Sequence, residues 1–293
     1  MPEESYKSRN RGFVTSSKLK AFGFCQYLYY LAYEKESVPE LDSDAILFGS
    51  AVDKWFELGE KKWKEDWAVV SVRISEEKLA EKIEAKKAQL EKAKTPVTKE
   101  KYASDLKELQ KLVGKRQITQ TMWEKVQGCD TEAQRSPLWS FDPKLSKKII
   151  ELPYKSLMLR GEMDQLKLAK NLIEDVKTTG AIANLERNFM EGYKIQLSFY
   201  QLLVQLKHDV LCDGRLEVLT NEKIVKSIFY FASKQGLLDY RVNIIRLLDE
   251  LVKCKERGIY AAQPPEMRQE KCLNCQAYGQ CNHAVQKKDL IIC

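Results

Sequence analysis

Asp164, Asp175 and Lys177 are the residues in the middle of the chain whose types and spacing could do chemistry. Apolar residues around 157–166 and at 172–173 predict two strands joined by a tight connection, which would place the two acids on adjacent strands. Asp175 and Lys177 are two residues apart, so they are expected to project from the same face of their strand. Two carboxylates and one ammonium group on one face suit a hard divalent cation and a positioned water. That is the equipment for metal-assisted phosphodiester hydrolysis.

Gln196 and Tyr200 extend this pattern into the next predicted helix, where a spacing of four residues places them on one face. An Asp, a short spacer across a hairpin, then Asp-x-Lys and finally Gln-x-x-x-Tyr resembles the PD-(D/E)XK nuclease superfamily and its RecB-like exonuclease branch. Either motif alone would also suit a half-exposed strand edge or an ordinary amphipathic helix, but their order and spacing together favour the nuclease. The resemblance implies an α/β fold with a restriction-endonuclease-like core, in which helices flank a mixed central sheet.

Asp53 and Glu57 lie four residues apart in another predicted helix, over residues 45–60, so their carboxylates are expected to face the same way. The segment is similar to the first motif of the same nucleases, Gly-(Thr/Ser)-x-x-His-x-x-x-Glu. Gly49 and Ser50 match it, and Asp53 stands at the histidine position. A carboxylate can replace imidazole for Mg²⁺ or Mn²⁺, because both ions prefer oxygen ligands. The alternative interpretation is a solvated acidic face on an amphipathic helix.

The resemblance also implies a role for each of these residues. The implied catalytic residues are Asp164, Asp175, Lys177, Gln196 and Tyr200, and the implied metal site comprises Asp53, Asp164, Asp175 and Glu57. The carbonyl of Val176 would be a further ligand, and Glu57 would hold an outer-shell water. Lys177 would orient or deprotonate the attacking water and offset the charge that develops on the phosphorane. The glutamine and tyrosine would position the strand and the lysine.

Four of the eight cysteines have the spacing of metal ligands. Cys272 and Cys275 form C-x-x-C, Cys281 follows closely, and Cys25 lies near the chain start behind a serine-led helix. This arrangement resembles the RecB-like nucleases with an iron–sulfur staple, such as AddB-type and CRISPR-associated exonucleases. In them a [4Fe-4S] cluster ties the last segment to the first helix. Those proteins usually have Pro after the first cysteine, where this chain has Gln26. Four thiolates also suit Zn²⁺, so both metals stay open.

The chain of 293 residues is predicted to be one RecB-like nuclease domain over residues 1–293. A Lys- and Glu-rich stretch predicts a charged helical hairpin within an insertion over residues 75–130, and residues 258–293 would form the C-terminal cysteine-cluster segment. The formal net charge of +7 is compatible with a nucleic-acid partner without requiring one. No apolar run approaches a membrane span and the N-terminus has no apolar signal core, so we expect no membrane and a cytoplasmic location.

The expected function is that of a Mg²⁺- or Mn²⁺-dependent DNA exonuclease in phage or bacterial DNA recombination, repair or processing. The alternative is a catalytically weak DNA-binding or recombination-partner module that keeps the nuclease fold. Asp53 at the histidine position favours this alternative, whereas the complete set of Asp164, Asp175 and Lys177 favours the enzyme. No ATP-binding signature is present, so any motor would be a partner protein. A recombination or helicase partner and an oligomer are both compatible with the sequence.

Overall fold

The computed structural model describes residues 10–38, 43–135, 147–179, 190–220, 226–263, 272, 275–277 and 281. The helices are α2 (Ser16–Phe24), α3 (Gln26–Tyr29), α4 (Asp44–Asp66), α5 (Glu76–Lys92), α6 (Pro96–Gln110), α7 (Gln120–Arg135), α8 (Met190–His208) and α9 (Lys234–Arg257), with a π-helical turn at Tyr30–Glu34 and a 3-10 turn at Leu168–Lys170. The strands are β1 (Phe13–Val14), β2 (Trp67–Val70), β3 (Arg116–Thr119), β4 (Lys148–Tyr154), β5 (Leu157–Met163), β6 (Gln165–Lys167), β7 (Leu172–Thr179), β8 (Asp213–Thr220) and β9 (Lys226–Ala232).

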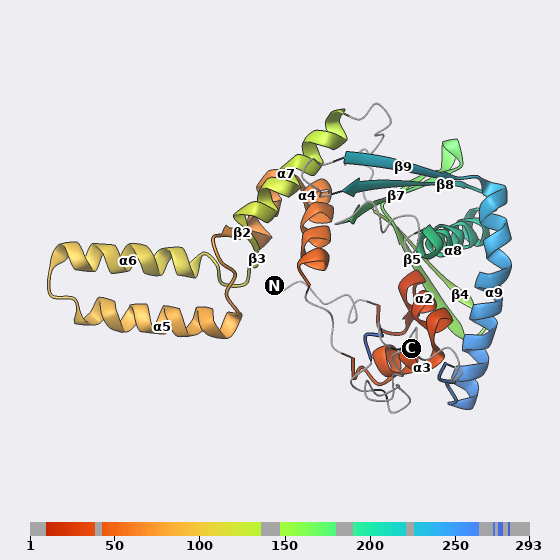
Figure 1. Ribbon diagram of the computed structural model, residues 1–293, viewed down its shortest axis with the longest axis horizontal. Helices are drawn as coiled ribbons and strands as arrows, with labels where there is room; N and C mark the ends of the chain where they lie inside the picture. The colour runs from red at the N-terminus through yellow and green to blue at the C-terminus, as the bar shows by residue number, and fades with distance from the viewer. Residues whose placement is uncertain are drawn as a thin grey trace, which may run out of the picture.

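Two mixed sheets occupy the centre of the molecule (Figure 1). In one sheet β5 pairs in parallel with β1 and antiparallel with β4. The other sheet has the order β6-β7-β8-β9, in which β7 and β8 are parallel and the other pairs are antiparallel. Asp164 is the single residue between β5 and β6, so the chain passes through it from one sheet to the other. Mixed sheets flanked by helices confirm the predicted α/β class.

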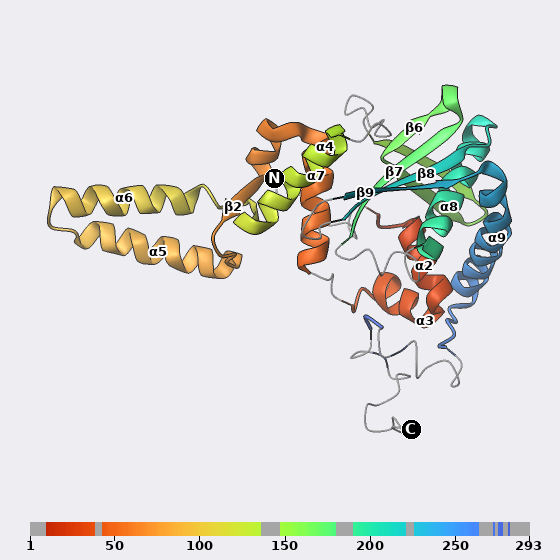
Figure 2. The same cartoon turned by 45° about the horizontal axis from the view of Figure 1, so that its top comes forward.

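The main hydrophobic core lies between these sheets and helices α2, α8 and α9, which Figure 2 shows on one side of the strands. Leu197, Phe199 and Leu203 of α8 are fully buried in it. Leu248 and Leu251 of α9 are also fully buried, on the apolar face that the helical periodicity predicts. Burial of apolar side chains on this scale is the dominant favourable term in folding, and here it fixes α8 against β5.

A second, smaller core joins α4 and α7 to the parallel pair β2–β3. The rings of Trp63 and Trp67 stack at 5.5 Å with planes 11° apart, and Trp123 packs on Trp63 at 4.8 Å. The buried Trp63 Nε1–H donates to the carbonyl of Ala51 at 3.0 Å. The backbone of α4 leaves helical geometry at Gly59, where φ is 71°, a conformation that favours glycine. This break lets the last part of α4 fold back onto its own earlier turns.

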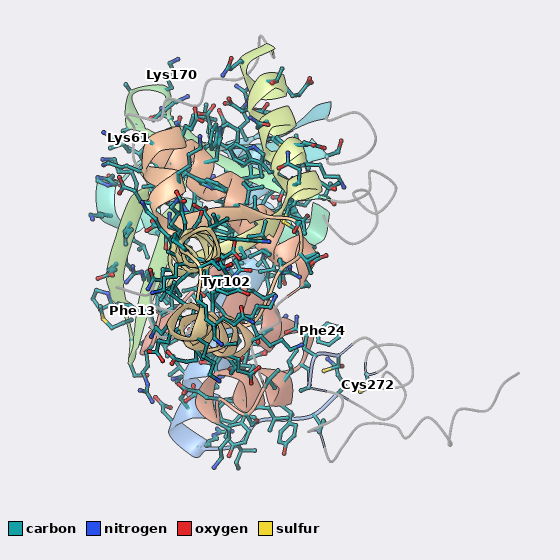
Figure 3. The ribbon with its side chains drawn as sticks, turned by 90° about the vertical axis from the view of Figure 1, so that its left-hand side faces the viewer. Phe13, Phe24, Lys61, Tyr102, Lys170 and Cys272 are labelled. Atoms are coloured by element: carbon teal, nitrogen blue, oxygen red, sulfur yellow. The ribbon has the colours of Figure 1, made fainter. Side chains whose placement is uncertain are left out.

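Helices α5 and α6 form a hairpin that extends away from both cores (Figure 1). Both helices lie wholly within the described residues, and of their side chains only Leu79 is buried. The two helices contact each other through an ion pair between Lys86 and Asp105 at 3.0 Å, and the same ammonium lies 5.0 Å from the Tyr102 ring centre. Figure 3 views the molecule from the hairpin side, where polar side chains surround Tyr102. The hairpin is therefore a charged arm, held to the protein at its base.

Two element boundaries follow from specific contacts. Strand β7 continues through Thr179 because this residue pairs with β8. Helix α9 begins at Lys234 because the Ser233 side chain caps its first turn. None of the helices in the described part of the chain is long and apolar enough to span a bilayer.

Candidate active site

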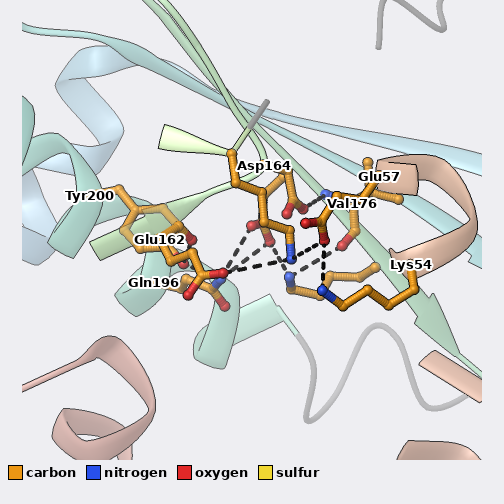
Figure 4. Close-up of polar contacts among 10 residues, drawn as sticks. Lys54, Glu57, Glu162, Asp164, Val176, Gln196 and Tyr200 are labelled. Carbon is orange, nitrogen blue, oxygen red and sulfur yellow. Dashed lines mark hydrogen bonds and ion pairs between the residues drawn. The ribbon is translucent and has the colours of Figure 1, made fainter. Parts of the chain in front are cut away.

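Asp164 and Asp175 meet where β5, β6 and β7 come together. Asp164 lies where the β6–β7 ladder ends, and its carboxylate continues the contact because Val176 N–H donates to Asp164 Oδ2 at 2.8 Å. On β7, Lys177 Nζ lies 2.5 Å from Asp175 Oδ2. The ammonium also donates to the carbonyl of Val176 at 3.2 Å. These groups form one polar cluster at the junction of the two sheets (Figure 4).

Helix α8 adds Gln196 and Tyr200 to this cluster. Gln196 Nε2 donates to Asp175 Oδ1 and Oδ2 at 3.3 and 3.2 Å and to Tyr200 Oη at 2.9 Å. Tyr200 O–H donates to the backbone carbonyl of Glu162 at 2.7 Å. The close approach of α8 depends on Gly161 of β5, because a Cβ there would lie 3.2 Å from Tyr200 Cδ1. The tyrosine thereby anchors α8 to β5 and the glutamine holds the carboxylate.

Asp53 reaches the site from α4, which packs on the other face of β7. Each face of β7 packs into a different hydrophobic core: Val176 packs with residues of α4, whereas Ile173 packs with residues of α8. Gly49 allows α4 to approach, because a Cβ at that position would lie 3.1 Å from Thr178 Oγ1. Asp53 lines the same cleft as the two acids of the strand junction. The structure thus brings together three carboxylates that are far apart in the sequence.

Glu57, one turn after Asp53, has different partners. Its carboxylate pairs with Lys54 at 3.1 Å and with Lys147 at 3.9 Å, and Lys147 Nζ also lies 3.8 Å from Glu162 Oε1. Glu57 is not among the residues that line the cleft. The lysines hold it beside the site rather than with the three aspartates (Figure 4).

Three further residues of the site belong to none of the sequence motifs. Lys147 directly precedes β4, and the charge of nearby carboxylates holds its pKa above the ordinary value although burial would lower it. Lys20 of α2 donates to Gln196 Oε1 at 3.2 Å. Glu162 stands two residues before Asp164, on the same strand face, which is the one signal by which sequence could have found it. Residue type alone does not distinguish the two lysines from the many others in the chain.

Burial and mutual repulsion both disfavour the charged form of the carboxylates in this site. Burial, with a smaller contribution from the charge of Asp164, raises the pKa of Asp53 to about 6. Burial also raises the pKa of Asp175 to about 7, against the attraction of Lys177. Burial alone would lower the pKa of Lys177, but the charges of Asp175 and Asp164 outweigh it and hold that pKa well above its usual range. Burial and the nearby Lys177 lower the pKa of Lys20 to about 8.

The donor set suits a hard divalent cation. Oxygen atoms of Asp53, Asp164 and Asp175, with the carbonyl of Val176, are the ligands that Mg²⁺ and Mn²⁺ prefer, and a cation there would relieve the repulsion between the acids. Among the described residues, no three His, Cys, Asp or Glu side chains are arranged around one point as metal ligands. At this site the Lys177 ammonium lies against Asp175 and provides the counter-charge. We expect metal binding to require Lys177 to leave Asp175 Oδ2.

An open cleft of about 850 Å³ gives access to the cluster. Its walls come from α2, α4, β5, β7, α8 and the base of the charged arm, where Lys115 and Arg116 lie. Basic side chains from α2, α4, β5, β7 and the base of the arm line the cleft around the carboxylates, which suits a polyanion whose reacting phosphate lies over a cation. This volume lies within the range of ligand-binding pockets.

The four cysteines with ligand spacing line one small cavity. Cys25, at the end of α2, shares it with Cys272, Cys275 and Cys281. Burial raises the pKa of Cys275, and the other three thiols raise it further. Figure 3 shows Cys272 beside the end of α2 at Phe24. The chain thus brings its remote first cysteine to the three late ones, although these thiols do not have a ready coordination geometry.

Comparisons with known proteins agree with this fold. Residues 15–277 match the family described as "PDDEXK-like domain of unknown function (DUF3799)". A crystal structure from Eubacterium rectale, named "Putative exonuclease", matches with a TM-score of 0.59 at 16% identity, over 97% of this chain and 93% of that chain. A structure of SSO0001 matches with a TM-score of 0.33 at 12% identity, over 82% of this chain and 96% of that chain, which is too low to indicate a shared fold. No protein of curated function matches. Because the family match covers most of its length, the chain belongs to the PDDEXK-like family.

Proposed function

We propose that the protein is a metal-dependent nuclease that hydrolyses phosphodiester bonds of DNA. The observation that carries the proposal is the meeting of Asp53, Asp164, Asp175 and Lys177 in one open cleft, although they come from three separate parts of the chain. Family membership and the likeness to the Eubacterium rectale protein support it at the level of the fold. A structural role for the cluster is a poor alternative, because three carboxylates near one another repel, and the ammonium groups of Lys177 and Lys147 offset that charge only in part.

Each residue has a distinct task in the proposed reaction. The three aspartates and the Val176 carbonyl would hold Mg²⁺ or Mn²⁺, which would polarise the phosphate and activate a water. Lys177, on the same strand face as Asp175, would orient the attacking water and offset charge on the pentacovalent phosphorus. Gln196 keeps the Asp175 carboxylate in place by donating to both of its oxygens. Tyr200 fixes α8 to β5, so it acts through Gln196 and not on the phosphate.

Exonuclease action and a role in phage or bacterial recombination, repair or processing form the finer part of the proposal. The alternative is a DNA-binding or recombination-partner module with weak catalysis, which Asp53 at the usual histidine position favours. The site favours the enzyme, because Asp53 enters the cleft as an oxygen donor and does not turn to a lysine as Glu57 does. An oxygen donor suits Mg²⁺ better than a nitrogen ligand would.

The test is digestion of end-labelled single- and double-stranded DNA with Mg²⁺ or Mn²⁺ and with EDTA. Asp175→Asn keeps the shape of the side chain and is expected to lose activity by orders of magnitude while its unfolding curve stays cooperative. Asp239→Asn, an exposed carboxylate of α9, is the matched control and should digest DNA as the unaltered protein does. Undiminished digestion by Asp175→Asn would overturn the assignment. DNA binding by the unaltered protein without any digestion would favour the alternative.

We also propose that Cys25, Cys272, Cys275 and Cys281 hold a metal group that ties the end of the chain to α2. The supporting observation is the cavity that all four line. Closing so long a loop would stabilise the fold chiefly by restricting the unfolded chain. The test is metal analysis and visible absorption of protein purified without oxygen. An iron–sulfur cluster is brown whereas Zn²⁺ on thiolates is colourless. Cys25→Ser should lose the metal and Cys254→Ser should keep it, and equal metal content in both would contradict the proposal.

A further inference from the structure

The cleft extends beyond the carboxylates to the first turn of α2. Ser16, Ser17 and Lys20 all line it, and they belong to one helix that begins after the cap residue Thr15. None of the three has a role in the chemistry proposed above. Their side chains offer hydroxyl and ammonium donors and no acidic group, so this end of the cleft differs from its carboxylate floor.

The first turn of α2 has hydrogen-bond donors to spare. The Thr15 side chain accepts from Lys18 N–H at 3.4 Å, which leaves the backbone N–H groups of Ser16 and Ser17 without an acceptor among the described residues. Such N–H groups and the positive end of the helix dipole together favour an anion. Ser16 is only 6% exposed, and its hydroxyl has no hydrogen-bond partner within the part of the chain that the structure describes. Because Ser16 is nine-tenths buried and lines the cleft, its hydroxyl is open toward the cleft, where a ligand can bond to it.

Lys20 lies one turn further along the same helix. Its ammonium donates to Gln196 Oε1 at 3.2 Å and lies 5.3 Å from the ring centre of Tyr193. Within the described residues it forms no ion pair with a carboxylate, which is unusual for a half-buried lysine. Gln196 in turn donates to Asp175, so Lys20 is separated from the candidate metal site by two hydrogen bonds. An anion bound by Lys20 would therefore be a near neighbour of the reacting phosphate.

We propose that the N-terminus of α2, with Ser16 and Lys20, binds a phosphate group of the nucleic-acid strand next to the phosphate that reacts at the aspartates. The inference rests on the proposed function, since it assigns a substrate contact within the same cleft. The bound group is either a terminal phosphate of the strand or an internal phosphodiester, and both offer oxygens to the same donors. A site of this kind would hold the strand in register over the metal, so that binding energy is spent on orientation.

The experiment measures oligonucleotide binding in EDTA, where no strand is cut, by fluorescence anisotropy. Four versions of one labelled single strand are compared: with a 5′-phosphate, with a 3′-phosphate, with no terminal phosphate, and with a neutral methylphosphonate at successive internal positions. Lys20→Met and Ser16→Ala are the test variants. Lys253→Met removes the same charge from an exposed position on α9 and is the control. Ser16 is not the cap residue, so both variants should fold, which their melting curves check.

We expect one modification of the strand to weaken binding to the unaltered protein and to Lys253→Met by about tenfold, the size of one charge-assisted contact. The same modification should leave binding to Lys20→Met unchanged, because the contact is already absent. Sensitivity to an end indicates a terminal phosphate, and sensitivity to one internal methylphosphonate indicates a phosphodiester. Modifications that weaken binding to all proteins by the same factor would overturn the proposal.

Titration with inorganic phosphate separates this inference from the proposed function. The amide NMR signals of Ser16 and Ser17 should shift in the unaltered protein and not in Lys20→Met. If phosphate shifts these amide signals but the protein neither binds nor cuts nucleic acid, the phosphate site is supported and the nuclease function is contradicted. In the opposite case, the protein digests DNA while phosphate shifts neither amide signal and every strand modification weakens binding to all variants equally. That result would support the nuclease function and would contradict the phosphate site.

Discussion

Gly161→Ala is the substitution that most directly tests how the fold builds the site. An added Cβ would overlap Leu203 Cδ1 and would lie 3.2 Å from Tyr200 Cδ1, and both of these side chains are on α8. Leu203 is fully buried and Tyr200 is 5% exposed, so neither side chain has room to turn away. We therefore expect α8 to shift outward, carrying the tyrosine and Gln196 with it.

The cost can be estimated from the two contacts. Overpacking a dense core by one methyl group typically costs about 1–3 kcal/mol of unfolding free energy. Leu203→Ala alone should cost about 2–5 kcal/mol, because it removes the buried side chain and leaves a cavity. In the double variant the new methyl group partly fills that cavity. The double variant should therefore lose about 1–2 kcal/mol less unfolding free energy than the two single variants lose together, which is within the range that residues in contact show.

Activity is expected to behave differently from stability. The contact at 3.2 Å between the new Cβ and Tyr200 Cδ1 persists when Leu203 is shortened, so Gln196 stays displaced from the Asp175 carboxylate. A displacement of about 1 Å at a positioning residue can cost up to about a hundredfold in rate. The double variant should therefore be more stable than the sum of the two single effects predicts, whereas its rate of DNA digestion should stay low.

The assay combines urea unfolding with digestion of labelled DNA for both single variants and the double variant. Gly236→Ala is the matched control, because a Cβ there meets only Ser233 Oγ at 3.4 Å and lies inside α9, far from the cleft. It should raise stability slightly, since alanine favours helix over glycine, and leave the rate unchanged. Additivity of Gly161→Ala and Leu203→Ala within about 0.5 kcal/mol would refute the reasoning.

Three further outcomes follow from single contacts. Tyr200→Phe removes the hydrogen bond to the Glu162 carbonyl and should lower the unfolding free energy by about 1–2 kcal/mol in urea, with slower but not abolished digestion. Burial would raise the pKa of Glu34, but hydrogen bonds from Lys255 and the Tyr29 hydroxyl outweigh burial and lower that pKa below 4.5. Ionised Glu34 thus stabilises the fold above about pH 4.5. The stabilisation is lost as the pH falls through the pKa that Glu34 has in the folded protein. Glu34→Gln should be less stable than the unaltered protein at pH 7 and equal to it in acid, and a pH-independent difference would contradict this. Replacing residues 83–106 of the arm by a short Gly/Ser linker should leave the urea midpoint nearly unchanged, because their side chains are not buried, and should weaken DNA binding most at low salt.

The elements that hold the site could be predicted because each has a local signature. Two apolar runs separated by a short polar stretch predict β5 and β7, and the spacing of Gln196 and Tyr200 predicts one face of α8. The α/β class follows from the order of such elements and is confirmed by the mixed sheets. These inferences need only the neighbours of a residue along the chain, which is the information a sequence carries directly.

Partners across the fold could not be predicted in this way. Glu57 shares a helix face with Asp53, yet its carboxylate pairs with Lys54 and Lys147, and the second of these directly precedes β4 in a different part of the chain. Lys20 contacts Gln196 across 176 positions of sequence. Helical periodicity gives the direction of a side chain, whereas the charge that meets it depends on which elements pack together.

Strand β7 is the element on which the geometry of the whole site depends. One of its faces packs through Ile173 into the main core with α8, and its other face packs through Val176 into the tryptophan-rich core with α4. Asp175 thus lies between a helix fixed by one core and Asp53, whose helix is fixed by the other. Because the two cores are separate, loosening the second core should displace Asp53 without moving Gln196. The spacing of the carboxylates, and with it the affinity for a divalent cation, is therefore set by the tryptophan cluster as much as by the residues that touch the ion.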